Sequence, residues 1–261
     1  MFFGLSIVLV TVLSSISLAS PQSPPAQTAN GFRVPAKTTA ADPAKALSPE
    51  MRGDILMARK MYREAIETYL LGPKDSPIMV NKIGIAYHQL LDLESAKKQY
   101  ERAIKLDSHY AEAINNLGTV FYARKSYRRA VNEYRKALRI NPESASFLSN
   151  LGTAYYARKQ YTEMAVAYQK ALEIDPDVFE RRSSTGTTLQ ERSVEERAKY
   201  HYFQAKIYAK SGQMERALMC IRKALEEGFK EKEKFLKDPE FAVLKDNQEF
   251  KLLMAAEQKV I

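Results

Sequence analysis

One phrase occurs twice in the chain, and this repetition limits the possible folds more than any other feature. Residues 115–127 read NNLGTVFYARKSY, and residues 149–161 read SNLGTAYYARKQY, 34 positions later. Over the longer windows 111–142 and 145–176, half of the aligned positions are identical and no gap is needed. A fixed period of this length is typical of stacked repeats, so we expect an array of similar units.

The same frame continues on both sides of these two windows. Ile83 and Gly84 stand where Leu117 and Gly118 do in the next window, and a worn version with Gly53 comes earlier. The predicted array covers 46–231, and its units are 46–76 (degenerate), 77–110, 111–144, 145–178 and 198–231.

Each unit carries two apolar patterns with helical spacing. In 111–124, Ile114, Leu117 and Phe121 recur on one face, and a second pattern covers 127–140. A short polar turn separates the two patterns, and Pro142 ends the second one. The unit is therefore predicted to be a helix–turn–helix.

Small residues recur at fixed places in the units. Gly118 costs about 1 kcal/mol of helix propensity, which makes sense if a neighbouring helix approaches too closely for a side chain. We assign a structural role to Gly84, Leu117, Gly118, Ala130, Ala137, Leu151, Gly152, Ala171, Ala217 and Ala224.

This spacing resembles the tetratricopeptide repeat (TPR), in which a Leu-Gly pair is followed by an aromatic residue, Ala, Tyr, Ala and Pro. Leu117-Gly118, Phe121, Ala130, Tyr134, Ala137 and Pro142 match it. The resemblance implies an all-α fold, a right-handed α-solenoid of stacked helix–turn–helix repeats with C-terminal capping helices. It also implies a concave groove that binds a protein or a peptide.

Two segments depart from the repeat. Residues 177–197 interrupt the register with a polar stretch rich in Thr and Ser, which predicts an insert loop before a helix capped by Ser193. Residues 232–261 lack the repeat pattern and are predicted to form C-terminal capping helices, with starts at Asp238-Pro239 and Asp246, because an array needs a cover for its last apolar face.

The amino terminus has a different composition. Residues 1–19 are uncharged and apolar and end in small residues, which predicts a cleaved signal peptide and an exported protein, in the periplasm or outside the cell. An uncleaved membrane anchor is the alternative, because no Lys or Arg precedes the apolar run. Residues 20–49 are rich in Pro, Ala and Thr and are predicted to be a flexible linker.

No motif for catalysis, a cofactor or a metal is found. The three histidines, His88, His109 and His201, lie far apart in the sequence, and the phosphate-binding and nucleophile motifs are missing. Cys220 is the only cysteine and sits in an apolar helical pattern. We expect a protein that is not an enzyme and needs no cofactor.

A polar and aromatic stripe runs beside the core-facing side of each first helix. The resemblance implies that this stripe lines the groove, and its amides, hydroxyls and Tyr rings suit an extended peptide. The candidate peptide-binding residues are Asn81, Lys82, His88, Asn115, Asn116, Thr119, Tyr122, Ser149, Asn150, Thr153 and Tyr156. Asn116 and Asn150 have an equal alternative, in which they hydrogen-bond the adjoining repeat. The five-residue clamp with which some relatives grip a terminal carboxylate is missing, and Lys82 is a fragment of it.

The formal net charge of +9 allows a second interpretation. Residues 111–144 hold seven Lys or Arg against three Glu, which is typical of a solvated helix face but also suits an anionic partner. Our main prediction is a non-catalytic scaffold that binds a protein or peptide, with no nucleic-acid partner and with membrane contact only if residues 1–19 stay uncleaved. The alternatives are a salt-sensitive binder of an anionic envelope surface or polyanion, and a self-associating structural protein.

Overall fold

The computed structural model describes residues 47–180 and 193–256. The predicted signal peptide, most of the predicted linker and the middle of the predicted insert loop lie outside these residues. The linker prediction runs slightly too far, because a helix already begins at Pro49 behind the N-cap Ser48. Within the described ranges, no helix has the length and the apolar character that crossing a membrane requires.

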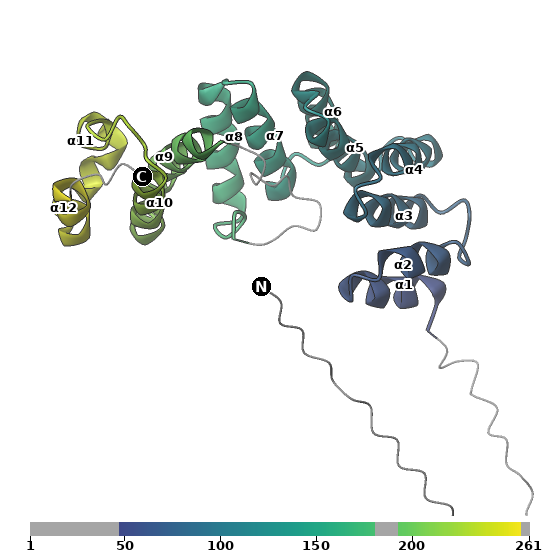
Figure 1. Ribbon diagram of the computed structural model, residues 1–261. Coiled ribbons are helices and arrows are strands. Elements are labelled where there is room, and N and C mark those ends of the chain that lie inside the picture. The colour runs from purple at the N-terminus through teal and green to yellow at the C-terminus, as the bar shows by residue number, and fades with distance from the viewer. Residues whose placement is uncertain (1–46, 181–192, 257–261) are drawn as a thin grey trace, which may run out of the picture. The chain divides into compact units, whose positions relative to one another are not determined.

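All regular structure in the described residues is helical, and the helices follow one another as pairs (Figure 1). The helices are α1 (Pro49–Ala58), α2 (Tyr62–Tyr69), α3 (Pro77–Gln89), α4 (Leu93–Leu106), α5 (Ala111–Ala123), α6 (Tyr127–Ile140), α7 (Ala145–Ala157), α8 (Tyr161–Ile174), α9 (Val194–Lys210), α10 (Met214–Glu226), α11 (Lys234–Lys237), the 3₁₀ helix η2 (Pro239–Leu244) and α12 (Gln248–Ala255).

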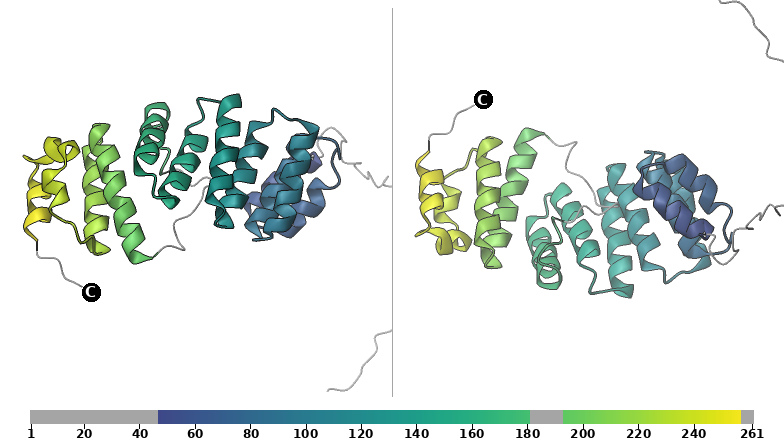
Figure 2. Two further views of the ribbon diagram at one scale, coloured as in Figure 1. Left: turned by 90° about the horizontal axis from the view of Figure 1, so that it is seen from above. Right: turned by 90° about the horizontal axis from the view of Figure 1, so that it is seen from below.

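From α1 to α10, each helix packs on the next one along the chain. The pairs α1–α2, α3–α4, α5–α6, α7–α8 and α9–α10 form the units, and the second helix of each pair contacts the first helix of the following pair (Figure 2). This arrangement confirms the predicted all-α solenoid of helix–turn–helix repeats.

In each of the first four pairs, a glycine of the first helix packs against a tyrosine of the second helix. The ring of the tyrosine lies directly on the glycine, where a side chain would leave no room for it. A Cβ atom would lie 2.2 Å from a Tyr69 ring carbon at Gly53, 2.6 Å from Tyr100 at Gly84, 2.6 Å from Tyr134 at Gly118 and 2.4 Å from Tyr168 at Gly152. Glycine is unfavourable in a helix, and the close packing of a large ring against it compensates for this cost.

The last pair solves the same packing problem with different residues. Ala205 of α9 and Ile221 of α10 stand at the equivalent positions, and both side chains are fully buried. Alanine is larger than the glycine of the other pairs and isoleucine is smaller than the tyrosine, so the two side chains together still fill the volume between the helices.

The turn inside each pair has a left-handed residue. Lys60, Leu91, Lys125 and Lys159 have φ near 60°, and Gly212 has φ 75°. After each left-handed residue, the next backbone N–H donates to a carbonyl five residues back, as Ser126 does to Phe121 at 2.8 Å. This is the Schellman ending of a helix, and it turns the chain back toward the second helix.

The C-terminal elements cover the last pair. η2 packs on α9 and α12 packs on α10, and Phe235, Phe241, Leu244 and Phe250 are buried there. The predicted start at Asp238-Pro239 is correct, but the last helix begins one residue later than predicted, since Asn247 and not Asp246 caps it. The short helix α11 was not predicted.

Candidate functional site

The structure buries most of the predicted groove stripe. Among its members, Lys82, His88 and Ser149 are half-buried. The buried members are Asn81, Asn115, Asn116, Thr119, Tyr122, Asn150, Thr153 and Tyr156. The expectation that these eight side chains face an open groove is therefore wrong. The physical reason is visible at α5, which contacts α3, α4, α6 and α7 and has helices on several sides.

The buried amides form a hydrogen-bonded ladder across three first helices. Asn116 of α5 donates its Nδ2 to Oδ1 of Asn81 in α3 at 3.0 Å. Asn150 of α7 donates to Oδ1 of Asn115 at 3.1 Å, and Asn115 donates to Asn116 within α5 at 3.4 Å. Asn81 ends the ladder by donating to the Tyr110 hydroxyl at 3.3 Å.

The ladder gives these amides a structural role. A buried amide without partners is costly, and a shift of one helix relative to the next would leave several of them unpaired at once. The alternative stated for Asn116 and Asn150, a hydrogen bond to the adjoining repeat, is the arrangement in the structure. Contact between the stripe residues and a ligand stays a prediction.

Threonine and histidine extend this polar core beside the ladder. Thr119 Oγ1 donates to the Asn116 carbonyl at 2.7 Å and lies 3.4 Å from His88 Nδ1. Burial lowers the pKa of His88, so the ring is neutral at neutral pH. Thr153 bonds the Ser149 carbonyl at 2.9 Å and the Tyr168 hydroxyl at 2.8 Å. Neither threonine presents its hydroxyl to solvent.

The two tyrosines of the stripe, Tyr122 and Tyr156, pack against other aromatic rings and are buried. The Tyr122 ring lies 5.2 Å from that of Tyr127. Tyr156 donates its hydroxyl to the Glu196 carbonyl at 2.6 Å, and its ring meets Tyr200 of α9 at 5.2 Å. Tyr156 therefore joins the third full unit to the last one.

Lys82 forms ion pairs with the first helix of the array, α1. Its Nζ lies 2.7 Å from Glu50 and 2.7 Å from Asp54, both on α1. Burial alone would lower the pKa of Lys82, but the two carboxylates outweigh this effect and raise it. The fragment of a carboxylate clamp is thus an ion pair within the array.

An open groove lies elsewhere, where α8 meets α9. These two helices approach each other less closely than α2–α3, α4–α5 or α6–α7 do. Large rings bridge the wider gap, and Tyr161 of α8 stacks on Phe203 of α9 with ring centres 4.5 Å apart. Tyr168 and Tyr200 meet edge to face deeper in the same junction.

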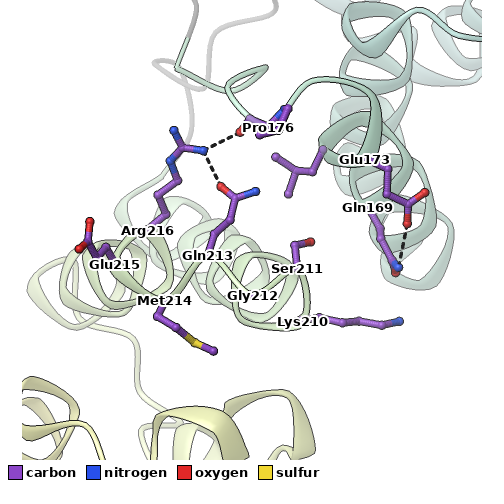
Figure 3. Close-up of a pocket in the computed structure, with 11 residues that line it drawn as sticks. Gln169, Glu173, Pro176, Lys210, Ser211, Gly212, Gln213, Met214, Glu215 and Arg216 are labelled. Carbon is purple, nitrogen blue, oxygen red and sulfur yellow. Dashed lines mark hydrogen bonds between the residues drawn. The ribbon is translucent and has the colours of Figure 1, made fainter.

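Two adjoining hollows follow this junction. One, of about 900 Å³, lies between the C-terminal half of α8 and the turn that joins α9 to α10 (Figure 3). The other, of about 340 Å³, lies farther along the same two helices. Gln169 and Lys210 line both, so we treat them together as the α8–α9 groove.

The groove has an apolar side and a polar rim. Its apolar surface comes from Tyr161, Ala165, Val166, Leu172, Phe203 and Ile207. Val166 is 65% exposed, which is unusual for a Val on a helix that otherwise packs against its neighbours. Lys210 is exposed on the rim, and Lys199 lies 4.9 Å from the Tyr161 ring.

Arg216 closes one end of the groove. Its guanidinium donates to the Pro176 carbonyl at 2.7 Å and to Gln213 at 2.5 Å (Figure 3). It also pairs with Asp177 and Glu180, each at 2.5 Å. With its donors engaged in this way, Arg216 holds the chain after α8 against α10.

The sequence contained a signal for this groove, although no site was predicted from it. The interruption at 177–197 breaks the repeat register between α8 and α9, and a broken register is where helices are free to separate. Val166 stands at an outward helical position of the repeat pattern, where the preceding unit has Asn132, so the pattern is consistent with its exposure but does not show that it lines a groove.

Chemically reactive clusters are not found around these residues. In the residues that the structure describes, no group of His, Cys, Asp or Glu is placed to hold a metal ion. Cys220 is buried, and burial raises the pKa of its thiol to about 12, so the thiol stays protonated and unreactive. The groove offers shape, apolar surface and charge.

The repeats match known family models. A model described as "Tetratricopeptide repeat" matches residues 79–110, 145–178 and 198–227, and one described as "TPR repeat" matches residues 118–158. These ranges contain tetratricopeptide repeats. The first three matches begin and end within four residues of the helix pairs α3–α4, α7–α8 and α9–α10. The match at 118–158 begins within α5, includes α6 and ends one residue after α7.

Solved TPR structures resemble parts of the chain. "MamA 41-end from Desulfovibrio magneticus RS-1" is 21% identical, with a TM-score of 0.47, over 69% of this chain and 93% of that one. MamA of AMB-1 is 19% identical, with a TM-score of 0.47, over 69% and 98%. The "First TPR of Spaghetti (RPAP3) bound to HSP90 peptide SRMEEVD" is 23% identical, with a TM-score of 0.41, over 45% and 96%. No curated protein sequence matches the chain.

Proposed function

We propose that this TPR array is a non-catalytic scaffold that binds a segment of another protein in the α8–α9 groove. One observation carries the proposal. Apolar side chains of α8 and α9, among them the 65% exposed Val166, line a groove at the junction where the repeat register is interrupted. Grooves that combine apolar surface with a few polar groups are where proteins hold small ligands and peptide segments.

The chemistry of the groove indicates what would fit. Val166 and Phe203 offer a floor for an apolar side chain of the bound segment. Lys199 and Lys210 stand near its edge and make no ion pair within the described chain, so an acidic residue of the segment next to these lysines would be favoured. The larger hollow is also lined by Glu173 and Glu215, so this preference is confined to the surroundings of the lysines. Burying one aliphatic side chain there contributes roughly 1.5–3 kcal/mol.

A selection experiment tests this proposal. Peptides would first be selected from a random display library on the full chain. Their affinity for the parent would then be compared with their affinity for Val166→Asp, which places a charge on the apolar side of the groove and leaves the core unchanged. The matched control is Leu252→Asp, because Leu252 is 63% exposed and lies on α12, none of whose residues lines the groove. We expect the first variant to weaken binding at least about tenfold, or 1.4 kcal/mol, and the control to bind like the parent.

The outcome is read together with folding. Both variants should keep the helical circular dichroism of the parent, since both substituted side chains are exposed. Selected peptides that bind all three proteins equally would place the binding site outside the α8–α9 groove. Selected peptides that share no apolar residue would contradict the proposed chemistry.

We also propose that the protein is exported. The support is the composition of residues 1–19 alone, which are apolar and end in the small residues before Ser20. N-terminal sequencing of the protein recovered from an envelope fraction would check this, and a mature chain that begins at Ser20 is the expected result. Recovery of the intact Met1 terminus in the membrane would favour the anchor instead.

A further inference from the structure

The exposed face of α6 is the most basic helix surface among the described residues. It carries Arg128, Arg129, Arg135, Lys136 and Arg139, and all five are exposed. Arg128, Arg135 and Arg139 lie seven and four residues apart, so they form one stripe along the helix. At 1.5 Å per residue, the stripe is about 16 Å long.

Very little negative charge neutralises this surface. Glu133 is the one carboxylate on α6, and it pairs with Lys136 at 2.7 Å. Arg128 and Arg139 make no ion pair within the described ranges, 47–180 and 193–256. Unpaired guanidinium groups on one helix repel each other, so their clustering weakens the array unless it serves to bind an anion.

Two of the arginines are already held in place by aromatic rings. The Arg129 guanidinium lies 4.0 Å from the centre of the Phe121 ring. Arg135 donates its Nε to the Tyr155 hydroxyl at 2.9 Å, which leaves its terminal nitrogens free. Side chains that are ordered before binding lose less conformational freedom when they bind.

The surroundings indicate the size of the partner. On α8, the exposed carboxylates Glu163 and Glu173 outnumber the one exposed lysine, Lys170, whereas α4 has more exposed Lys and Arg than Glu. A flat anionic membrane would press against the α8 carboxylates as well, whereas a narrow ligand would touch α6 alone. An extended polypeptide covers about 16 Å with five or six residues.

We propose that the α6 face binds an acidic polypeptide segment whose carboxylates pair with the arginines of this stripe. Arginine is suited to this because its planar guanidinium binds a carboxylate with two parallel hydrogen bonds. The proposal is independent of the α8–α9 groove, because it uses residues of a different helix.

The test uses fluorescein-labelled decaglutamate and the full chain, with binding read from fluorescence anisotropy. The variant Arg128→Glu/Arg139→Glu reverses two charges on the stripe. The matched control is Lys230→Glu/Lys237→Glu, which changes the net charge equally at exposed positions outside α6. We expect binding that weakens at least about fivefold as salt rises, at least about tenfold in the α6 variant, and less than about twofold in the control.

Three results would overturn the proposal. Equal losses in the two variants would mean that net charge alone attracts the peptide. Binding unchanged in the α6 variant would put the peptide elsewhere. Vesicles of phosphatidylserine or duplex DNA that bind the α6 face more tightly than decaglutamate would replace the polypeptide by a lipid surface or a nucleic acid. Circular dichroism of both variants checks that the helices are intact.

Discussion

At the scale of single residues, the repeated tyrosine of the second helix shows how equivalent positions differ. Its ring packs on the glycine of the first helix in each of the first four pairs. Its hydroxyl does not meet the same environment in every pair. Tyr168 bonds Thr153 at 2.8 Å and Tyr200 at 3.1 Å, whereas the buried hydroxyl of Tyr134 has no hydrogen-bond partner among the described residues. Burial raises the pKa of Tyr134, so this hydroxyl remains neutral.

This difference predicts opposite effects of one substitution. Tyr134→Phe removes a buried hydroxyl that lacks a partner and should be neutral or stabilise the array by up to about 1 kcal/mol. Tyr168→Phe leaves Thr153 and Tyr200 without that partner and should destabilise the array by about 1–2 kcal/mol. Urea denaturation of the two variants measures both values, and each serves as the control of the other. Equal effects would mean that the hydroxyl environments do not differ as the structure shows.

Tyr156 is buried, so its substitution tests the stability of the array and not partner binding. Because the side chain packs on Tyr161, Tyr200 and Phe203, Tyr156→Ala would remove part of the core at the junction of two units. Losing such a side chain costs about 3–5 kcal/mol. Weaker partner binding in this variant would therefore reflect stability, whereas Val166 in the α8–α9 groove can be changed without this effect.

At the scale of elements, the attachment of the C-terminal cap depends on a small polar cluster. Tyr202 of α9 donates its hydroxyl to the Asp238 carboxylate at the start of η2. Lys206 of α9 lies 2.9 Å from the same carboxylate and 3.2 Å from Glu240. Around this cluster, the rings of Tyr202 and Phe229 stack with centres 4.6 Å apart. The cluster aligns η2 on α9, while the rings supply the buried apolar area.

A pH dependence follows from this cluster. Burial alone would raise the pKa of Asp238, but Tyr202 and Lys206 outweigh it and lower the pKa below its ordinary value near 3.8. The unfolded chain therefore takes up this proton at a higher pH than the folded protein does. The stabilisation is fully present above about pH 4 and is lost as the pH falls through the folded pKa.

The measurement compares the parent with Asp238→Asn. The difference in their free energy of unfolding should be largest near neutral pH and should shrink below about pH 4. Glu249, which pairs with Arg222 at 2.6 Å on a more exposed surface, supplies the control Glu249→Gln. A difference between the parent and Asp238→Asn that stays constant with pH would contradict the role of the carboxylate.

At the scale of the whole array, stability is expected to be uneven. α5 contacts four other helices and is linked to α3 and α7 by the asparagine ladder, whereas α8 and α9 approach each other less closely. In stacked repeats, stability is close to a sum of the stability of each unit and of its contacts with its neighbours. The contact between successive units is smallest at the α8–α9 junction, so this junction should contribute least to the sum.

Hydrogen exchange would show this unevenness. Amides of α5, α6 and α7 should exchange slowest, and α9, α10 and the cap should exchange together. Ile221→Ala in α10, at a cost of about 2–5 kcal/mol, should speed exchange in α9, α10 and α12 and leave α5 nearly unchanged. The reciprocal control is Val131→Ala in α6. Faster exchange of the whole array in both variants would mean that the α8–α9 junction couples the units fully.

The repeat predicted much of the architecture because its signals are local. Apolar spacing at Ile114, Leu117 and Phe121 and the polar turn that follows depend on residues close together in the chain. The glycines also pointed correctly to close contact between helices, although only the structure names the tyrosine ring as the partner. The last helix start was wrong by one residue because Asp246 and Asn247 both cap helices well.

The sequence by itself determined that this chain forms helix pairs, how the pairs recur, and which face of each helix is apolar. The tertiary structure decided which of the remaining faces meet solvent. Asn115 and Tyr156 look like groove residues in the repeat pattern but are buried, while Val166 and Phe203 line an open groove. The physical reason is that exposure depends on the spacing between successive pairs, and this spacing is set by contacts between residues far apart in the chain, such as the Asn150–Asn115 bond and the Tyr161–Phe203 stack.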